Sequence, residues 1–208
     1  LYVGKVANNH ALPQPEIKRL LVEKAREGKI VARLKGGDPY IFGRGGEEAQ
    51  ALLKEAIPFE EVPGISSTIA APAYAGIPLT HRDLVSSVTF ITGHEQPGKT
   101  VSSINWDALA RSGSTLVFVM GVKNLPNIVA NLTAAGLDPK TPSAIIYRGT
   151  TCRQRSLVAP LEDLARRANE EGFTNPSVIV VGAVVSLHKE LNWFEQKPLD
   201  RKSTRLNS

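Results

Sequence analysis

The residues best suited to chemistry lie in one glycine-rich stretch, from Leu34 to Glu48 (LKGGDPYIFGRGGEE). Gly36 and Gly37 remove side chains where a backbone must approach a ligand closely or adopt a positive φ. Asp38 follows them and can accept hydrogen bonds from ribose hydroxyls or pair with an amino group. Five glycines in eleven residues are more than a tight turn capped by Asp-Pro would need. We therefore interpret this stretch as a ligand-binding loop.

The same stretch argues against two common phosphate-binding motifs. No Gly-Lys-Ser/Thr follows it, as a P-loop requires, and Glu48 stands where a dinucleotide fingerprint beginning at Gly43 needs glycine. A carboxylate at the start of a helix also repels phosphate. A cationic or hydroxyl-bearing nucleoside therefore fits the loop better than a nucleotide triphosphate.

Two further turns carry polar groups. In Val62–Ser67 (VPGISS), Ser66 or Ser67 can contact a ligand or simply cap the following helix. The stretch 76–82 (GIPLTHR) ends in Arg82, which can pair on the surface or hold a carboxylate with its planar fork. Both alternatives stay open for each turn.

Familiar catalytic sets are absent from the sequence. The four histidines are scattered, the single cysteine, Cys152, provides neither a zinc-binding spacing nor an internal disulfide, and there is no Gly-x-Ser-x-Gly. We therefore predict no metal site and expect a reducing compartment, the cytoplasm. An enzyme built on this sequence would act mainly by positioning an already reactive cofactor.

Composition excludes several classes of protein. The 208 residues are 42% hydrophobic and 22% charged, which is typical of a globular chain. Most of the net charge of +5 comes from the last twelve residues, so we expect no nucleic-acid partner. The longest apolar stretch, 178–187, is about half the ~20 residues of a membrane helix, so we expect no membrane span.

The elements that must position these residues alternate between strands and helices. Continuous or short apolar runs predict strands at 1–3, 29–34, 59–62, 87–92, 115–120, 142–147 and 178–185, the last as one strand or as a strand pair interrupted by Gly182. Apolar stripes with helical spacing, or small residues after a turn, predict helices around 17–25, 49–56, 66–75, 125–132 and 161–168. This order is typical of an α/β fold. The unbroken apolar runs at 117–120 and 178–181 indicate strands buried on both faces.

A polar segment rich in Gly and Pro, 93–100, separates two such arrays and predicts a hinge. We therefore expect two α/β lobes, 1–93 and 94–199, with a ligand cleft between them. Residues 200–208 are expected to be a disordered tail. The chain starts within a predicted strand and without Met, so we expect that an N-terminal segment precedes it in the parent protein.

Several motifs in this order resemble the tetrapyrrole methylase family, and specifically its uroporphyrinogen-III C-methyltransferases. The resemblance covers about residues 1–195 and rests on YVGK (2–5), VARLKGGDPYIFGRGGEE (31–48), VPGISS (62–67), GIPLTHR (76–82), TGH (92–94), TLVFVMG (115–121), RGTT with a following Gln (148–154) and IVVGAVV (179–185). The LKGGDPYIFGRGGEE block together with GIPLTHR is its most specific part.

The resemblance implies a fold of two α/β lobes that bind S-adenosyl-L-methionine in their cleft, usually in a homodimer. It implies two methyl transfers, to C2 and C7 of uroporphyrinogen III, which give precorrin-2 for siroheme and cobalamin biosynthesis and two molecules of S-adenosyl-L-homocysteine. Two alternatives remain: another methyltransferase of the precorrin or corrin ring, and a fragment that binds the cofactor without turnover. A nucleic-acid methylase is a weaker third, because the chain without its last twelve residues carries a charge of only +2.

The family's functional positions are carried over to matching residues. Its cofactor contacts fall on Gly36, Gly37, Asp38, Ile41, Ser66, Ser67, Met120 and Gly149. Lys5 matches a lysine proposed as a proton donor, and our candidates for binding the substrate's carboxylates are Arg44, Arg82 and Arg148. The Met120 thioether can pack against adenine, although a plain core role is the alternative.

The sequence departs from the family pattern in three places. The family's GxGPGD loop and its Tyr-Asp-Arg segment, which holds a proposed base aspartate, have no counterpart in this chain. Val6 stands where many members have Arg, and Ser67 stands where Ala is common.

Overall fold

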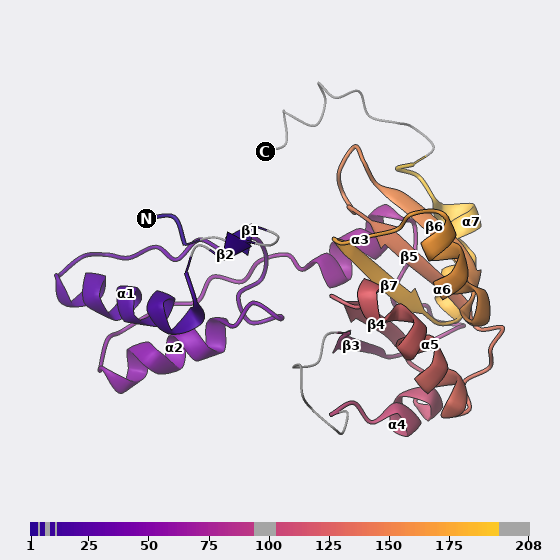
Figure 1. Cartoon of the computed structure of the whole chain (residues 1–208), viewed down its shortest axis with the longest axis horizontal. Coiled ribbons are helices and arrows are strands. Elements are labelled where there is room, and N and C mark those ends of the chain that lie inside the picture. Colours follow the sequence, from indigo (N-terminus) through magenta and orange to yellow (C-terminus); the bar gives the residue numbers. More distant parts are fainter. Residues whose placement is uncertain (4, 7–8, 11, 94–102, 196–208) are drawn as a thin grey trace. The chain divides into compact units, whose positions relative to one another are not determined.

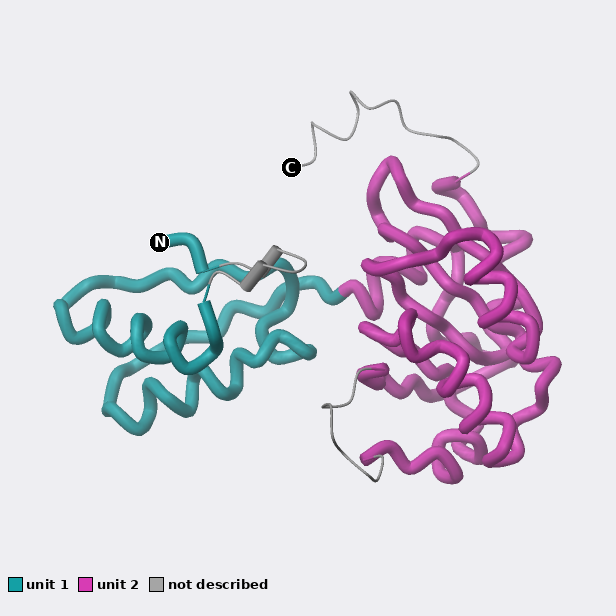
Figure 2. Tube along the Cα trace, in the orientation of Figure 1, with its two compact units in different colours: residues 1–66 teal, residues 67–208 magenta. Residues whose placement is uncertain are grey.

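A computed structural model describes residues 1–3, 5–6, 9–10, 12–93 and 103–195 of the chain (Figure 1). The chain divides into two compact units, residues 1–66 and residues 67–208, which are coloured separately in Figure 2. The two lobes expected from the sequence, 1–93 and 94–199, stay a prediction. The segment 94–102 at their boundary and the predicted tail 200–208 lie outside the described residues.

Unit 1 is built on two helices, α1 (Gln14–Arg26) and α2 (Gly45–Lys54), which pack against each other. The predicted helical stripe is confirmed in α1, where Ile17 is 2% exposed, and the helix is followed by Gly28 in the left-handed region (φ +77°). A short antiparallel pair, β1 (Lys5–Val6) and β2 (Asn9–His10), precedes α1.

Three strands predicted in unit 1 do not form. Residues 1–3, 29–34 and 59–62 have no strand structure, and large apolar side chains in them are exposed, including Ile30, Leu34 and Val62. An apolar run becomes a strand only when a neighbouring strand takes up its backbone hydrogen bonds. The described part of unit 1 provides no strand beside these runs, so the predictions were wrong.

Unit 2 contains a five-stranded sheet in the order β3-β4-β7-β5-β6. Its strands are β3 (Val88–Thr92), β4 (Thr115–Val119), β5 (Pro142–Tyr147), β6 (Arg155–Pro160) and β7 (Ser177–Val181). The β3–β4 pair is parallel, and the β4–β7, β5–β7 and β5–β6 pairs are antiparallel. Because β4 and β5 both run opposite to β7, they run in the same direction as each other.

Helices cover both faces of this sheet (Figure 1). Leu116 and Phe118 of β4 pack in a core with α5 (Leu125–Ala134) and α6 (Leu161–Glu170). Val117 and Val119 face the opposite core, with residues of α3 (Ser67–Tyr74) and the 3₁₀ helix η2 (Ala183–Leu187). Every residue of β4 and β7 is buried. The predicted burial on both faces is confirmed for 117–119 and 178–181, whereas Met120, the last residue of the first run, lies beyond β4 and is half exposed.

The remaining elements of unit 2 were not predicted from the sequence. They are β6, α4 (Trp106–Arg111), the 3₁₀ helix η1 (Val122–Asn124) and α7 (His188–Leu191). The strand predicted over 178–185 is wrong in its second half, because β7 ends at Val181 and Gly182 (φ +146°) turns the chain into η2. None of the helices in the described ranges has both the length and the apolar character needed to span a bilayer.

Candidate functional site

The carboxyl ends of β3, β4 and β5 meet at one edge of the unit 2 sheet, because these three strands run in the same direction. Ligands in α/β proteins bind preferentially at such an edge. The predicted residues Met120, Arg148 and Gly149 directly follow β4 and β5, so the fold brings them to this edge, on strands separated by β7.

Met120 is held at the edge in an unusual backbone conformation. Its φ is +57°, in the left-handed region, and its side chain is about half exposed (50%). A Cβ on Gly93, which follows β3, would lie 2.3 Å from the Cα of Gly121, so the ends of β3 and β4 are in close backbone contact. Met120 belongs to neither buried core cluster of unit 2, so its thioether is available for a ligand.

The turn after β5 is strained on both sides of Gly149. Arg148 (φ +46°) and Thr150 (φ +70°) are both left-handed, at about 1–3 kcal/mol each. A Cβ on Gly149 would lie 2.5 Å from the Cβ of Ala71 in α3, so only glycine fits there. The turn is held in part by the Arg148 N–H, which donates to the carbonyl of Pro176 (3.0 Å).

Arg148 has a donor that no described group uses. Its Nε is buried without a hydrogen-bond partner in the described structure, and its guanidinium lies over the ring of Tyr147 (5.3 Å to the centroid). A buried donor without a partner is costly and fits an acceptor supplied by a ligand. Arg148 is therefore suited to bind a carboxylate.

Asp38 in unit 1 joins two loops. Its Oδ1 accepts hydrogen bonds from the N–H groups of Tyr40 (2.9 Å) and Ile41 (3.1 Å), and its Oδ2 accepts one from Gly64 (3.1 Å). The N–H of Gly64, with those of Tyr40 and Ile41, lowers the pKa of Asp38 below its ordinary value. The sequence did not reveal this bond to Gly64, because the partner lies 26 residues away.

The glycines of this loop differ in why they are needed. A Cβ on Gly37 would lie 3.1 Å from the carbonyl oxygen of Ile65, so Gly37 allows the two loops to approach. No described atom lies within 4 Å of a Cβ built on Gly36. Packing within the chain therefore does not require glycine at position 36, which leaves room for close approach of a ligand.

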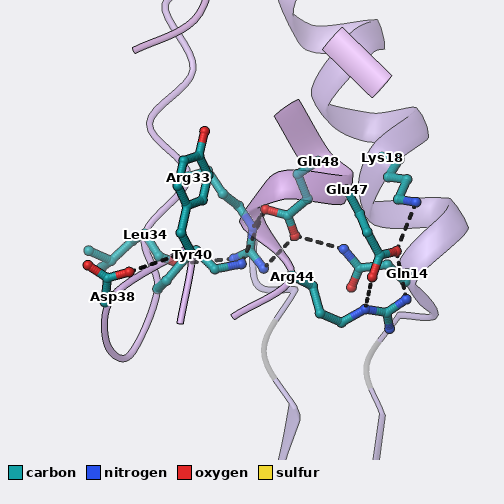
Figure 3. Close-up of polar contacts among 10 residues, drawn as sticks. Gln14, Lys18, Arg33, Leu34, Asp38, Tyr40, Arg44, Glu47 and Glu48 are labelled. Carbon is teal, nitrogen blue, oxygen red and sulfur yellow. Dashed lines mark hydrogen bonds and ion pairs between the residues drawn. The ribbon is translucent and has the colours of Figure 1, made fainter. Parts of the chain in front are cut away.

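A network of charges lies beside this loop (Figure 3). Glu48 of α2 is 5% exposed and accepts a hydrogen bond from the Gln14 amide (2.9 Å). Lys35 (3.2 Å) and Arg33 (3.4 Å) both pair with its carboxylate. Burial alone would raise the pKa of Glu48, but the hydrogen bond and the two cations outweigh burial and lower it. Sequence reasoning treated Glu48 only as a helix-start carboxylate and missed this role.

The predicted substrate residue Arg44 is already paired. It precedes α2 in the left-handed conformation (φ +60°) and binds both carboxylate oxygens of Glu47, at 2.8 and 2.9 Å. Arg44 and Lys18 together lower the pKa of Glu47 to about 2 (Figure 3). Arg44 would have to leave this pair in order to bind a substrate.

The other predicted residues are placed as follows. Ser66 is buried and directly precedes α3, whereas Ser67 is exposed as the first residue of α3. Arg82 is exposed in the turn between His81 and Val85, and pairs with no described residue. Lys5 lies in β1. No geometry here tests their predicted roles, so these remain predictions.

Comparison with known proteins shows which family this chain resembles. A family model described as Tetrapyrrole (Corrin/Porphyrin) Methylases matches residues 2–165. An S-adenosyl-L-methionine-dependent uroporphyrinogen III methyltransferase of Methanosarcina barkeri is 55% identical over 186 residues, which are 89% of this chain and 73% of the relative. A siroheme synthase of Pseudomonas aeruginosa is 51% identical over 195 residues, which are 94% of this chain but only 42% of that longer relative.

A solved structure shares the fold. The chain superimposes on uroporphyrin-III C-methyl transferase of Thermus thermophilus, crystallised with S-adenyl homocysteine, with a TM-score of 0.72 and 37% identity. The match covers 90% of this chain and 78% of that structure. With the family model matching most of its length, the chain belongs to the tetrapyrrole (corrin/porphyrin) methylases.

Proposed function

We propose that this chain methylates uroporphyrinogen III with S-adenosyl-L-methionine, at C2 and C7, to give precorrin-2 for siroheme and cobalamin biosynthesis. The relatives that share 51–55% identity are named for this substrate and for siroheme synthesis. The structural observation that supports the proposal most strongly is the sheet edge of unit 2. There an exposed thioether, an arginine donor that bonds to none of the described groups and a sterically required glycine follow strands that run in the same direction.

The residues present fit the cofactor. In unit 2, Met120 offers a half-exposed thioether for an adenine ring, and Gly149 leaves the strand end without a side chain. In unit 1, Gly36 leaves open space beside the loop that Asp38 holds through hydrogen bonds, and the Ile41 N–H is one of the donors to Asp38. We assign Gly37, Ser66 and Ser67 to the cofactor as well, from the family resemblance.

The substrate carries several carboxylates, which must meet cations. Arg148 is the strongest candidate, because its buried Nε lacks a partner among the described residues. Arg82 is exposed and available, whereas Arg44 competes with its own pair to Glu47. A planar guanidinium binds a carboxylate with two parallel hydrogen bonds, which also orients it.

The chemistry needs little more from the protein than alignment. When bound, S-adenosyl-L-methionine would supply a methyl group on a cationic sulfur, so that an electron-rich pyrrole carbon could bond to the methyl while S-adenosyl-L-homocysteine leaves. Residues that fix both reactants can contribute up to about 7–11 kcal/mol to the lowering of the barrier. Each methyl transfer must be balanced by the loss of one proton from the ring system, and Lys5 is our candidate for a proton donor to that ring system, from the family resemblance. We further expect a cytoplasmic homodimer, as in the family.

The test is direct. The 208-residue chain is incubated without oxygen with uroporphyrinogen III and methyl-labelled cofactor, and the product is identified by mass. We expect addition of two methyl groups. Transfer to a different corrin-ring precursor but not to uroporphyrinogen III would favour another ring methylase. Calorimetric binding of S-adenosyl-L-homocysteine without any transfer would favour the binding-only alternative.

A further inference from the structure

The turn that carries Arg148 and Gly149 is shaped by a side chain that follows it. The carboxamide Oε1 of Gln154 accepts a hydrogen bond from the N–H of Thr150 at 2.7 Å. Gln154 is 9% exposed, whereas Thr150 is exposed, so a buried side chain reaches out to the backbone of the turn. Thr150 is one of the two left-handed residues that flank Gly149, and such a conformation persists only when its surroundings fix it.

A carboxylate fixes the orientation of the Gln154 amide. Gln154 Nε2 donates to Glu195 Oε1 at 2.9 Å, and the Ser156 hydroxyl donates to the same oxygen at 2.5 Å. A carboxylate can only accept hydrogen bonds, so it selects the NH₂ end of the amide. The carbonyl oxygen of the Gln154 amide must then face Thr150, whose N–H donates to it. Glu195 therefore determines which groups the amide offers to the turn.

Glu195 is itself anchored on α3. The two preceding residues, Trp193 and Phe194, form an aromatic cluster with Tyr74 of α3, with ring centroids 4.9–5.6 Å apart. Trp193 Nε1 donates to the carbonyl of Ala73 at 3.1 Å. The same helix contacts Gly149 through Ala71. Helix α3 therefore contacts the turn directly, and it also holds the segment that carries Glu195.

We propose that Gln154 and Glu195 are positioning residues for the Arg148–Thr150 turn, and that through it they set the affinity for the cofactor. This inference rests on the proposed function, because it assigns Gly149 to the cofactor. Neither residue needs to touch a ligand. Glu195 orients the amide of Gln154, and the amide holds Thr150 of the turn in its left-handed conformation at the sheet edge.

The pair can be tested by exchanging its two side chains. In Gln154→Glu, two carboxylates face each other, and their repulsion should open the turn. In the double variant Gln154→Glu with Glu195→Gln, the carboxylate at 154 again accepts from Thr150 and from the NH₂ of the new amide, whose second hydrogen is donated to the Ser156 hydroxyl oxygen. We therefore expect the single variant to be impaired and the double variant to be restored.

Two readouts are needed. Hydrogen exchange at the Thr150 amide reports the turn without any ligand, with the Ile179 amide in β7 as an internal reference for the core. Calorimetry gives the Kd of S-adenosyl-L-homocysteine. We expect Gln154→Glu to speed Thr150 exchange and to weaken binding by about tenfold each, the scale of one lost hydrogen bond. Cofactor KM should rise while kcat at saturating cofactor is retained, and the double variant should reverse these changes.

Gln50→Glu, on the exposed side of α2, is the matched control for an added carboxylate, and should change neither readout. Unchanged Thr150 exchange and Kd in Gln154→Glu would overturn the proposal, as would a double variant that stays impaired. Faster exchange with unchanged Kd would overturn the link to the cofactor. If Gln154→Glu does not fold, a double variant that folds supports the pair and one that does not overturns it. Wild-type chain that binds no S-adenosyl-L-homocysteine would refute the proposed function, and Thr150 exchange would still decide whether the pair holds the turn.

Discussion

At the scale of single residues, Asp38 shows how one carboxylate can organise a binding loop. Both of its oxygens accept backbone N–H groups, from Tyr40, Ile41 and Gly64. The carboxylate thus replaces regular secondary structure as the partner of these donors. Its predicted contact with the cofactor would have to use the remaining lone pairs of the same oxygens.

This role predicts a defined pH dependence. The pKa of Asp38 in the folded chain lies below its ordinary value of 3.8. The hydrogen bonds to the Asp38 carboxylate therefore stabilise the fold fully above the unfolded pKa, and this stabilisation is lost as the pH falls through the folded pKa. The amide chemical shifts of Tyr40 and Gly64 should therefore stay constant at neutral and mildly acidic pH and change only below about pH 3.8. Asp38→Asn should remove this transition and disorder the loop already at pH 7, because its NH₂ group would face a backbone donor. Shifts that change around pH 6 would contradict the assignment.

Two substitutions at Met120 should differ in their effect on stability but not in their effect on binding. Met120→Ala and Met120→Gly both remove the thioether, but only Ala retains the left-handed strain. The glycine variant should therefore be more stable than the alanine variant by about 1 kcal/mol, measured by urea unfolding. Both should weaken S-adenosyl-L-homocysteine binding to a similar extent. Equal stability of the two variants would show that the backbone at 120 carries no strain.

At the scale of elements, Gly149 and Gly36 differ in how closely other elements pack against them. A methyl group at Gly149 collides with Ala71 of α3, so Gly149→Ala should destabilise the chain by about 1–3 kcal/mol. Gly36→Ala meets no described atom, so its stability should stay close to that of wild type while its cofactor binding weakens. Thermal unfolding and calorimetry distinguish these outcomes. Ala71→Gly combined with Gly149→Ala should recover part of the lost stability, and no recovery would show that the contact is not the cause.

Much of unit 2 was predictable because its strands are continuous apolar runs buried on both faces, as in β4 and β7. The edge strand β6 was missed, although Leu157 and Ala159 alternate with more exposed residues, because its polar start resembles a loop. The runs at 29–34 and 59–62 were wrongly predicted because composition reports apolar character but not the presence of a pairing neighbour.

Local sequence context singled out only part of the candidate site. Gly36 stands in an unusually glycine-rich stretch after a predicted strand, whereas Met120 and Gly149 were assigned from the family resemblance, and the roles of all three stay predictions. The partners that order them were not found. Glu195 lies 41 residues from Gln154, and Gln14 lies 34 residues from Glu48. Such contacts depend on tertiary packing, and no local pattern in the sequence encodes them.

At the scale of the whole molecule, the apolar core is distributed unevenly. Both core clusters lie in unit 2, one on each face of the sheet, whereas Ile17 is the one buried hydrophobic residue among those described in unit 1. The helices of unit 1 carry many ion pairs instead, and exposed pairs such as Arg19 with Glu16 and Glu23 contribute little. Local stability should follow the buried area rather than the number of ion pairs.

The unequal core predicts an order of opening that hydrogen exchange in increasing urea can measure. Amides of α1 and α2 should exchange at lower urea than those of β4 and β7, because each buried aliphatic side chain of the sheet adds about 1.5–3 kcal/mol. Leu132→Ala, which removes a fully buried side chain from α5, should lower protection in β4 and β7 by about 2–5 kcal/mol. The matched control Leu53→Ala, at a 64% exposed position, should change protection by less than about 0.5 kcal/mol. If the helices of unit 1 and the strands of unit 2 instead exchanged with the same urea dependence, the chain would open in one cooperative step, and the buried area of each unit would not determine its stability.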